Sequence, residues 1–308
     1  MKSLDIIIPI LNENENINKI FTEISNLKLN LSYRVIFIDD GSNDSTLNII
    51  KKIALKNKNV KFLSLTKNFG HQIALSAGLD FTDADMIIML DGDMQHPVKY
   101  IRTLIEKYDQ GYDVVQMVKI NQGKRNIFIR FVSYIFYFLF RKFSTLNLSN
   151  NVSDFRLISK RVNVIMKNIK EKDRFIRGLV QWTGFNYIEI PYKPDERFHG
   201  KSKYGFFKLV KLASQGIFSF SSLPLRISLY FGLLLSFFSF LYGIFAIIKK
   251  INNPENTPIG YTDLIVFITF LGGIQIMFLG IIGLYLSKVF EQVRDRPLYL
   301  IKEKNIND

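Results

Sequence analysis

No cysteine occurs among the 308 residues, so the chain can form neither disulfide bonds nor thiolate metal sites. Its 3 histidines are scattered and do not show the HExxH spacing of a zinc site. The sequence also has no GxGxxG loop after its first predicted strand and no GxxxxGK(S/T) loop, which disfavours a nicotinamide-dependent enzyme and a P-loop NTPase. A bound nucleotide would therefore have to be held by carboxylates and a metal ion.

Acidic residues are in the minority, because 41 Lys and Arg stand against 27 Asp and Glu, for a formal charge of +14. Such a balance suits a partner that carries phosphate, such as nucleic acid, anionic lipid or a phosphate-rich substrate. Hydrophobic residues make up 48% of the chain and gather after about residue 125. Much of the positive charge lies around these apolar segments, so we expect membrane lipid as a partner and no nucleic acid.

Two long runs without a charged residue occupy 227–248 and 264–287. Each matches the roughly 20 residues that cross a bilayer core of about 30 Å, whereas buried helices of a soluble domain rarely stay apolar on every face. A short polar loop joins the runs, which predicts a two-helix transmembrane hairpin. Basic residues at its outer ends place both termini in the cytoplasm of a multi-pass inner (plasma) membrane protein. The predicted organisation is a cytoplasmic domain over 1–225, the hairpin over 226–288 and a cytoplasmic basic tail over 289–308.

Two further segments mix basic residues with aromatic ones at helical intervals. They lie near 124–143 (KRNIFIRFVSYIFYFLFRKF) and 205–220 (GFFKLVKLASQGIFSF). Both patterns suit interfacial helices at the level of the lipid headgroups, with ordinary core-facing helices as the alternative.

Strand and helix patterns alternate through the first 120 residues. The hydrophobic periodicity predicts strands over 5–11, 33–38, 60–65, 86–90 and 113–118, separated by helices over 14–27, 45–56, 72–81 and 97–110. This alternation is typical of an open α/β sheet with helical crossovers, in which ligands bind beyond the carboxyl ends of the strands.

Polar clusters follow three of the predicted strands directly. They are Asn12-Glu13, Asp39-Asp40 and Asp91-Gly92-Asp93. Taken alone, the last could be a surface turn, because Asp-Gly is common in turns. Since all three should meet at one edge of the sheet, we favour a site for a divalent cation and a phosphate-bearing ligand.

Six sequence blocks occur in order along the chain, followed by the two apolar runs: IIIPILNENENI, VIFIDDGSNDST, IIMLDGDMQHP, VSDFRLISKRV, FIRGLVQWTGF and RFHGKSKYGFFKL. Together they resemble the polyprenyl-phosphate glycosyltransferases of the inverting GT-A group in glycosyltransferase family 2. This group includes bactoprenol glucosyltransferase and dolichol-phosphate mannose synthase. The resemblance covers almost the whole chain and implies a GT-A catalytic domain with a Rossmann-like sheet.

The resemblance also assigns the donor site. It implies that Asp91 and Asp93 form a DxD motif, in which Asp93 binds Mg²⁺ or Mn²⁺ directly and Asp91 lies nearer the ribose or a bound water. Gln95 would help to hold the diphosphate and the metal. The nucleobase and ribose would be lined by Pro9, Leu11, Glu13, Ile38 and Asp40.

On the acceptor side the resemblance points to Asp154 and Arg156, and it implies phosphate-binding roles for Lys119, Arg197 and Lys203. Asp154 could act as a general base or as an electrostatic organiser. A polyprenyl monophosphate, with a second pKa of about 6, is already ionised near pH 7, which favours the organiser.

The expected reaction moves one sugar from a nucleoside-diphosphate donor to polyprenyl (undecaprenyl) phosphate, with inversion to a β-linked product. UDP-glucose is the expected donor by similarity, while UDP-N-acetylglucosamine, another UDP-sugar and GDP-mannose stay open. A processive synthase is disfavoured because the QxxRW pattern is missing. The alternative from another class is a catalytically silent membrane scaffold or lipid-translocation partner. Whether the chain forms a homo-oligomer is left open.

Overall fold

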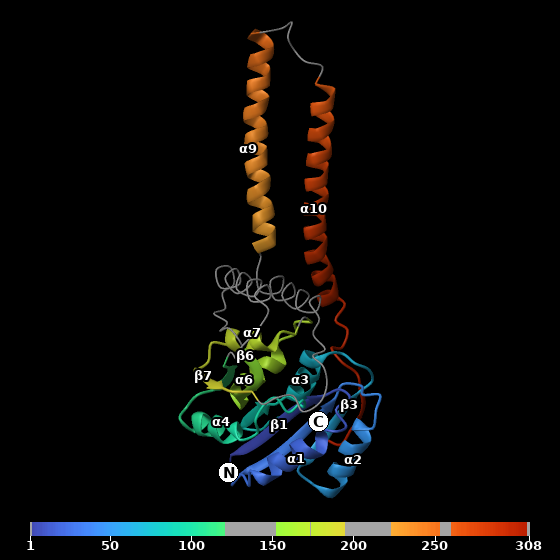
Figure 1. Ribbon diagram of the computed structural model, residues 1–308, viewed down its shortest axis with the longest axis vertical. Coiled ribbons are helices and arrows are strands. Elements are labelled where there is room, and N and C mark those ends of the chain that lie inside the picture. The colour runs from blue at the N-terminus through green and yellow to red at the C-terminus, as the bar shows by residue number, and fades with distance from the viewer. Residues whose placement is uncertain (1, 121–151, 173, 195–222, 253–259, 307–308) are drawn as a thin grey trace. The chain divides into compact units, whose positions relative to one another are not determined.

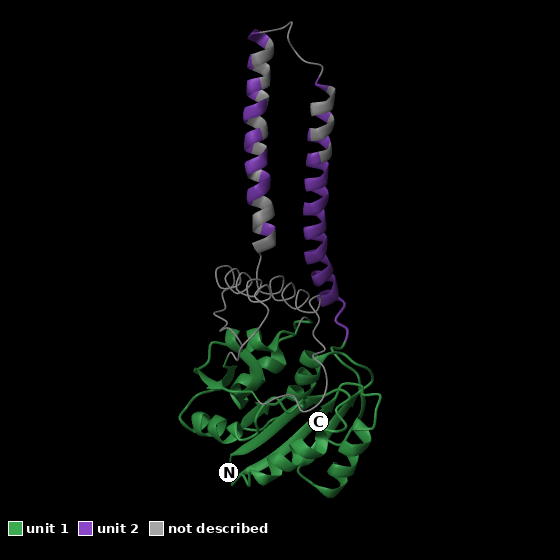
Figure 2. Cartoon of the chain, in the orientation of Figure 1, with its two compact units in different colours: residues 1–209, 297–308 green, residues 210–296 purple. Residues whose placement is uncertain are grey.

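A computed structural model describes residues 2–120, 152–172, 174–194, 223–252 and 260–306. The chain divides into two compact units (Figure 2). Unit 1 comprises Met1–Leu209 together with Pro297–Asp308, and unit 2 comprises Val210–Arg296. Unit 2 is thus an insertion near the carboxyl end of unit 1.

Strands and helices alternate along the first part of unit 1, as the periodicity predicts (Figure 1). In chain order they are β1 (Ser3–Ile10), α1 (Ile17–Asn26), β2 (Ser32–Asp39), α2 (Thr46–Lys56), β3 (Val60–Leu65), α3 (His71–Asp80), β4 (Met86–Met89), α4 (Tyr100–Asp109) and β5 (Val114–Lys119). Every strand and helix predicted over these residues is confirmed, with ends that shift by a few positions.

The described residues of unit 1 contain five further elements, none of which is predicted from the sequence. They are β6 (Val152–Ser159), α6 (Lys160–Asn168), α7 (Ile176–Trp182), β7 (Tyr187–Tyr192) and β8 (Ile301–Lys304). The strands form one sheet in the order β7-β5-β6-β4-β1-β2-β3-β8. β6 runs antiparallel to β4 and β5, and β8 runs antiparallel to β3, so the predicted open α/β sheet is confirmed as a mixed one.

Both faces of the central strands are buried, which explains their nearly continuous apolar sequences. On one face Ile6, Ile8 and Ile10 of β1 pack in a core with apolar residues of α1, α2 and α4. On the other face α3 crosses β1 and β2 at Gly78, where an added Cβ would lie 2.4 Å from Ile7 Cγ2. Glycine therefore allows the close helix-to-sheet approach that fixes α3.

Part of the predicted basic tail forms the edge strand β8 of the sheet in unit 1. Leu63 and Ser64 of β3 pair with Lys304 and Glu303 of β8, and Asn305 Oδ1 accepts the Phe62 backbone N–H at 2.6 Å. The edge of β3 offers unpaired backbone groups, and such groups favour the addition of another strand even when its exposed side chains are charged. Residues 301–304 are therefore an edge strand of the sheet in unit 1.

Unit 2 contains two long helices, α9 (Leu223–Asn252) and α10 (Tyr261–Val293). Both predicted spans are helical. Among the described residues, one stretch, Phe270–Val293, is long and apolar enough to cross a membrane, judged by length and composition alone. The transmembrane hairpin stays a prediction. The segments predicted to be interfacial, 124–143 and 205–220, lie outside the described residues.

Candidate active site

The carboxylates of Asp91 and Asp154 come from neighbouring strands that run in opposite directions. Asp91 follows β4 in the chain, whereas Asp154 belongs to β6. The register pairs Met89 with Arg156, so Asp154, two residues earlier in the antiparallel strand, lies beyond the carboxyl end of β4. Ligands of open α/β sheets bind at this edge. The fold thus brings the predicted metal motif beside the predicted acceptor-side carboxylate.

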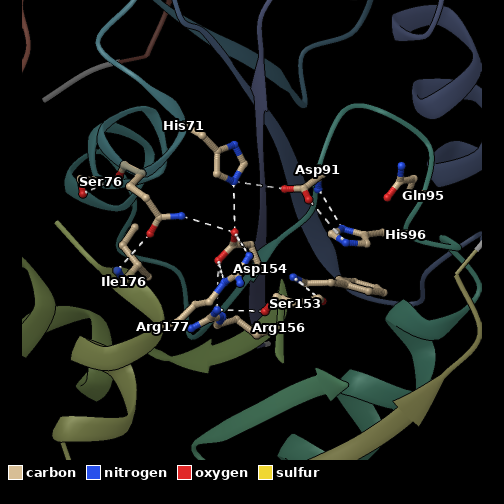
Figure 3. Close-up of polar contacts among 12 residues, drawn as sticks. His71, Ser76, Asp91, Gln95, His96, Ser153, Asp154, Arg156, Ile176 and Arg177 are labelled. Atoms are coloured by element: carbon tan, nitrogen blue, oxygen red, sulfur yellow. Dashed lines mark hydrogen bonds and ion pairs between the residues drawn. The ribbon is translucent and has the colours of Figure 1, made fainter. Parts of the chain in front are cut away.

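His71, the first residue of α3, lies between these two carboxylates (Figure 3). Its Nε2 is 3.3 Å from Asp91 Oδ1 and 3.4 Å from Asp154 Oδ2. Burial alone would lower the pKa of His71, but the two carboxylates outweigh that effect and raise the pKa to about 9. The imidazole is therefore a cation at neutral pH, and it offsets the repulsion between two carboxylates that lie close together.

Asp154 is nearly buried and receives hydrogen bonds from three elements. Arg177 of α7 donates from Nε to Oδ1 at 2.9 Å and from Nη2 to Oδ2 at 2.7 Å. Gln72 Nε2 of α3 donates at 3.3 Å and Arg156 Nη2 of β6 at 3.2 Å. Burial would raise the pKa of Asp154, but Arg177 and His71 hold that pKa well below its usual range. Asp154 is therefore ionised at neutral pH and is a weak base.

Arg156 follows Asp154 by two residues in β6 and is completely buried. Its Nη2 also donates to the Ser153 carbonyl oxygen at 3.0 Å, whereas Nε and Nη1 have no hydrogen-bond partner among the described residues. Burial lowers the pKa of Arg156 to about 10, so the guanidinium keeps its charge at neutral pH. A buried charge of this kind needs an opposite one nearby, and Asp154 supplies it.

A second histidine, His96, holds the other side of Asp91. His96 Nδ1 accepts a hydrogen bond from the Asp91 backbone N–H at 3.2 Å, and its Nε2 is 3.4 Å from Asp91 Oδ2. Burial lowers the pKa of His96, and the ring stacks on Phe155 with centroids 5.1 Å apart. A neutral His96 therefore fixes the position of Asp91 without adding charge, in contrast to His71.

The predicted metal ligands Asp91, Asp93 and Gln95 lie in the loop after β4. Asp93 Oδ1 accepts the Gln95 backbone N–H at 3.1 Å, and Gln95 Oε1 accepts from Lys119 Nζ at 3.4 Å. Asp91 Oδ1 is buried and makes no hydrogen bond to a described residue. Its contact with His71 is an ion pair. Within the described ranges no group of three or more His, Cys, Asp or Glu side chains could hold a metal alone. These oxygen donors fit a hard cation that takes its other ligands from a diphosphate and water.

Two of the residues predicted to line the nucleobase pocket are buried. Pro9 and Ile38 are neighbours in the register of β1 and β2, and both are buried. The side chain of Ile38 is 0% exposed because it packs where α3 crosses the sheet at Gly78. Ile38 therefore belongs to the core, and its contact with a nucleobase stays a prediction. Leu11, directly after β1, is partly exposed.

The two carboxylates of this predicted pocket have partners within the protein. Glu13 Oε2 accepts from Asn16 Nδ2 at 2.6 Å. Asp40 accepts the backbone N–H groups of Phe69 and Gly70 at 2.8 and 2.9 Å, and burial raises the pKa of Asp40. Asp40 thus orders the turn that leads into α3. Its contact with a nucleobase stays a prediction.

Of the three predicted phosphate-binding residues, the structure describes one, Lys119. Lys119 ends β5 and contacts Gln95 in the metal loop. Arg197 and Lys203 lie outside the described residues, and their roles stay predictions.

Four residues that contact the two central carboxylates are not predicted from the sequence: His71, Gln72, His96 and Arg177. The histidines are scattered and lack the spacing of a zinc site, so the sequence alone gives them no role. His71 and Gln72 follow the third predicted strand. The rule that ligands bind beyond the carboxyl ends of the strands therefore places these two residues at the same edge. Nothing in the local sequence around Arg177 indicates that α7 reaches Asp154.

Comparison with known proteins identifies the family. Residues 5–164, just over half of the 308-residue chain, match Glycosyl transferase family 2. The chain belongs to this family and is a glycosyltransferase, as the resemblance predicted. Its Rossmann-like mixed sheet confirms the predicted GT-A class of fold.

Relatives match the chain over nearly its full length. A bactoprenol glucosyl transferase of Shigella phage SfX is 38% identical over 305 residues, which are 98% of this chain and 99% of the relative. An uncharacterized glycosyltransferase of Synechocystis sp. is 36% identical over 302 residues, or 97% of this chain and 95% of the relative. Among solved structures, glucosyl-3-phosphoglycerate synthase of Mycobacterium tuberculosis is 18% identical with a TM-score of 0.47, covering 70% of this chain and 76% of that one.

Proposed function

We propose that the chain is a membrane-anchored inverting glycosyltransferase that moves one sugar from a nucleoside-diphosphate donor to polyprenyl phosphate, such as undecaprenyl phosphate. UDP-glucose is the proposed donor, because relatives named bactoprenol glucosyl transferases match 98% of the chain. One observation carries the proposal. His71 joins Asp91, from the predicted metal motif, to Asp154, from the predicted acceptor pair, in a single ion-paired cluster.

On the donor side, Asp91, Asp93 and Gln95 would hold the diphosphate through Mg²⁺ or Mn²⁺. Such an ion stabilises the negative charge that develops on the departing nucleoside diphosphate. Without a cation, the carboxylates of Asp91 and Asp93 would repel the diphosphate. In this proposal the phosphates receive further positive charge from Lys119, Arg197 and Lys203.

On the acceptor side, an oxygen of the lipid phosphate attacks the anomeric carbon from the face opposite the diphosphate. The new carbon–oxygen bond forms as the bond to the diphosphate breaks, so an α-linked donor gives a β-linked product. A phosphate with a second pKa of about 6 is largely deprotonated at pH 7 and needs no strong base. The low pKa of Asp154 supports a role for this carboxylate in holding Arg177 and Arg156 in place.

The proposed anchor is a hairpin of α9 and α10. Unit 1 contains residues on both sides of unit 2, because β8 pairs with β3 in one sheet. A membrane crossing by α10 therefore requires a second crossing within residues 210–296, and α9 is the long helix that can provide it. The excess of basic residues at the outer ends of the two helices favours a cytoplasmic site on the inner (plasma) membrane.

Two alternatives lead to different products. The same transfer could use UDP-N-acetylglucosamine, another UDP-sugar or GDP-mannose, because the described site has no residue that we can assign to sugar recognition. A catalytically silent scaffold or lipid-translocation partner is the alternative from another class. The intact carboxylate cluster at the sheet edge speaks against it.

A donor panel tests the proposal. Membranes that contain the chain are incubated with Mn²⁺, undecaprenyl phosphate and radiolabelled UDP-glucose, UDP-N-acetylglucosamine or GDP-mannose, and the lipid is extracted into organic solvent. Acid-labile label in the lipid from UDP-glucose is the expected result. Label from another donor reassigns the sugar, and the absence of label from the whole panel contradicts the transferase proposal.

A further inference from the structure

The start of α7 depends on a side chain from α3. The first N–H groups of a helix have no partner within the helix. Phe175, at the N-cap of α7, makes no side-chain cap hydrogen bond, but the Ile176 N–H donates to Gln72 Oε1 at 3.0 Å. Gln72 thus supplies the acceptor that α7 lacks at its first residue.

The same amide group contacts the central carboxylate. Gln72 Nε2 donates to Asp154 Oδ2 at 3.3 Å. The orientation of the amide follows from its surroundings, since the Ile176 N–H can only donate and Asp154 is ionised and can only accept. Each end of the Gln72 amide therefore has one suitable partner, and exchange of its oxygen and nitrogen would break both bonds.

These contacts close a ring through three elements. Arg177, the residue after Ile176, donates two hydrogen bonds to Asp154, and Gln72 binds both Ile176 and Asp154. A shift of α7 relative to β6 would stretch the Arg177 pair and the Gln72 bonds together. Gln72 is thus placed to keep the arginine and the carboxylate in register.

We propose that Gln72 is a positioning residue that acts through Asp154, setting this carboxylate and the start of α7 relative to each other for the transfer reaction. The inference rests on the proposed function. The amide carries no charge, and its nitrogen and oxygen bind Asp154 and Ile176. Its contribution is geometric, and a displacement of about 1 Å at a site of this kind can reduce the rate about 100-fold.

Two substitutions separate positioning from simple packing. Gln72→Glu keeps the size of the side chain and an oxygen for the Ile176 N–H, but it turns a second negative charge toward Asp154. Gln72→Met keeps the approximate size and removes both bonds. We expect kcat to fall about 10-fold for Gln72→Met and about 100-fold for Gln72→Glu, while KM for the sugar donor changes less than about threefold. The matched control is Gln110→Glu, the same change at an exposed position at the end of α4, which should leave both constants unchanged.

A second measurement does not depend on transfer. Gln72→Met, Arg177→Met and the double variant are compared by thermal unfolding of the full chain in detergent. Because both residues act on Asp154, the shift in unfolding midpoint of the double variant should be smaller than the sum of the two single shifts.

The outcomes are distinguishable. Wild-type values of kcat and KM in Gln72→Glu, or strictly additive midpoint shifts, would overturn the positioning role. Absence of transfer by the wild-type chain with every donor would count against the proposed function instead, and the additivity of the midpoint shifts would then decide the role of Gln72.

Discussion

Arg177 holds Asp154 with two parallel hydrogen bonds, from Nε to Oδ1 at 2.9 Å and from Nη2 to Oδ2 at 2.7 Å. Only a guanidinium provides two donors in this fixed geometry. The pair joins α7 to β6 at the carboxyl edge of the sheet, where His71 and Asp91 also lie. The orientation of Asp154 is therefore set by residues distant in sequence.

Substitution of this arginine tests the pairing. Arg177→Lys keeps the charge but replaces the fork with a single ammonium group, so we expect kcat to fall about 10-fold. The matched control is Arg161→Lys, because Arg161 makes a similar two-bond pair with Asp113 but has a 64% exposed side chain. The control should change kcat less than about twofold, since Asp113 directly precedes β5 and so lies at the opposite end of this strand from Lys119 and the site. Equal effects of the two substitutions would contradict a special role for Arg177.

The pH dependence of the rate distinguishes a base from an organiser. The pKa of Asp154 is lowered in the folded chain, so Asp154 is already ionised throughout the range from pH 5 to 8. Activity at low acceptor concentration should rise through pH of about 6 as the lipid phosphate loses its second proton. The residual activity of Asp154→Asn should keep this rise. If the rise disappears in Asp154→Asn, the carboxylate is the titrating base.

The lowered pKa of Asp154 also has a consequence for stability. A carboxylate whose folded-state pKa is below its unfolded value stabilises the fold above the unfolded pKa of about 3.9 and loses that contribution as the pH falls further. Asp154→Asn should therefore lower the unfolding midpoint at pH 6 and approach the wild-type value below pH 4. Circular dichroism melts of the two proteins in chelator across this range provide the measurement, and a constant difference at all pH values would contradict it.

The docked tail should contribute to the stability of unit 1. Asn305→Ala removes the acceptor of the Phe62 N–H, which lies at 2.6 Å, and should cost about 1–2 kcal/mol. Lys302→Ala in β8, the strand that precedes Asn305, changes an exposed side chain and should stay within about 0.5 kcal/mol. Thermal unfolding compares the two variants. Equal stability of Asn305→Ala and wild type would show that the tail adds little to the sheet.

The close approach of α3 predicts a steric effect. Gly78→Ala would place a methyl group 2.4 Å from Ile7 Cγ2, and overpacking of this kind costs about 1–3 kcal/mol. In the Gly78→Ala background, Ile7→Leu removes the Cγ2 branch and should recover part of the loss, whereas Ile7→Val keeps the branch and should not. Denaturant unfolding of the four proteins tests this pattern, and equal behaviour of the Leu and Val variants would disprove the proposed clash.

The sequence predicts the first half of unit 1 well because its elements follow one another in space as they do along the chain. Alternating strands and helices, with polar residues after each strand, are sufficient to place Asp91 and Asp93 at the binding edge. β6 and β8 are different, because both pair with strands from elsewhere in the chain. The sequence IKEK of β8 is highly charged, and only the free edge of β3 explains its position in a sheet.

In the site, too, some features follow from the local sequence and others depend on distant segments of the chain. Asp154 and Arg156 are recognised through a family resemblance, but local patterns would place two charged residues of this kind on the surface. They are buried because Arg177, Gln72 and His71 satisfy Asp154 from other elements. Conversely, Ile38 is an apolar residue in a predicted pocket that belongs to the core. Burial of this kind depends on tertiary partners, which periodicity does not reveal.

We propose that carboxylates at the sheet edge bind a metal–diphosphate donor from which sugar passes to a lipid phosphate. The most direct measurement compares UDP release with label in undecaprenyl phosphate from UDP-[¹⁴C]glucose and Mn²⁺, for wild type, Asp93→Asn and the surface control Asp109→Asn, all confirmed in the membrane fraction. We expect one UDP per labelled lipid in wild type and control, and a loss of more than about 100-fold in Asp93→Asn. Undiminished lipid labelling by Asp93→Asn would contradict the proposal that these carboxylates bind the metal–diphosphate donor.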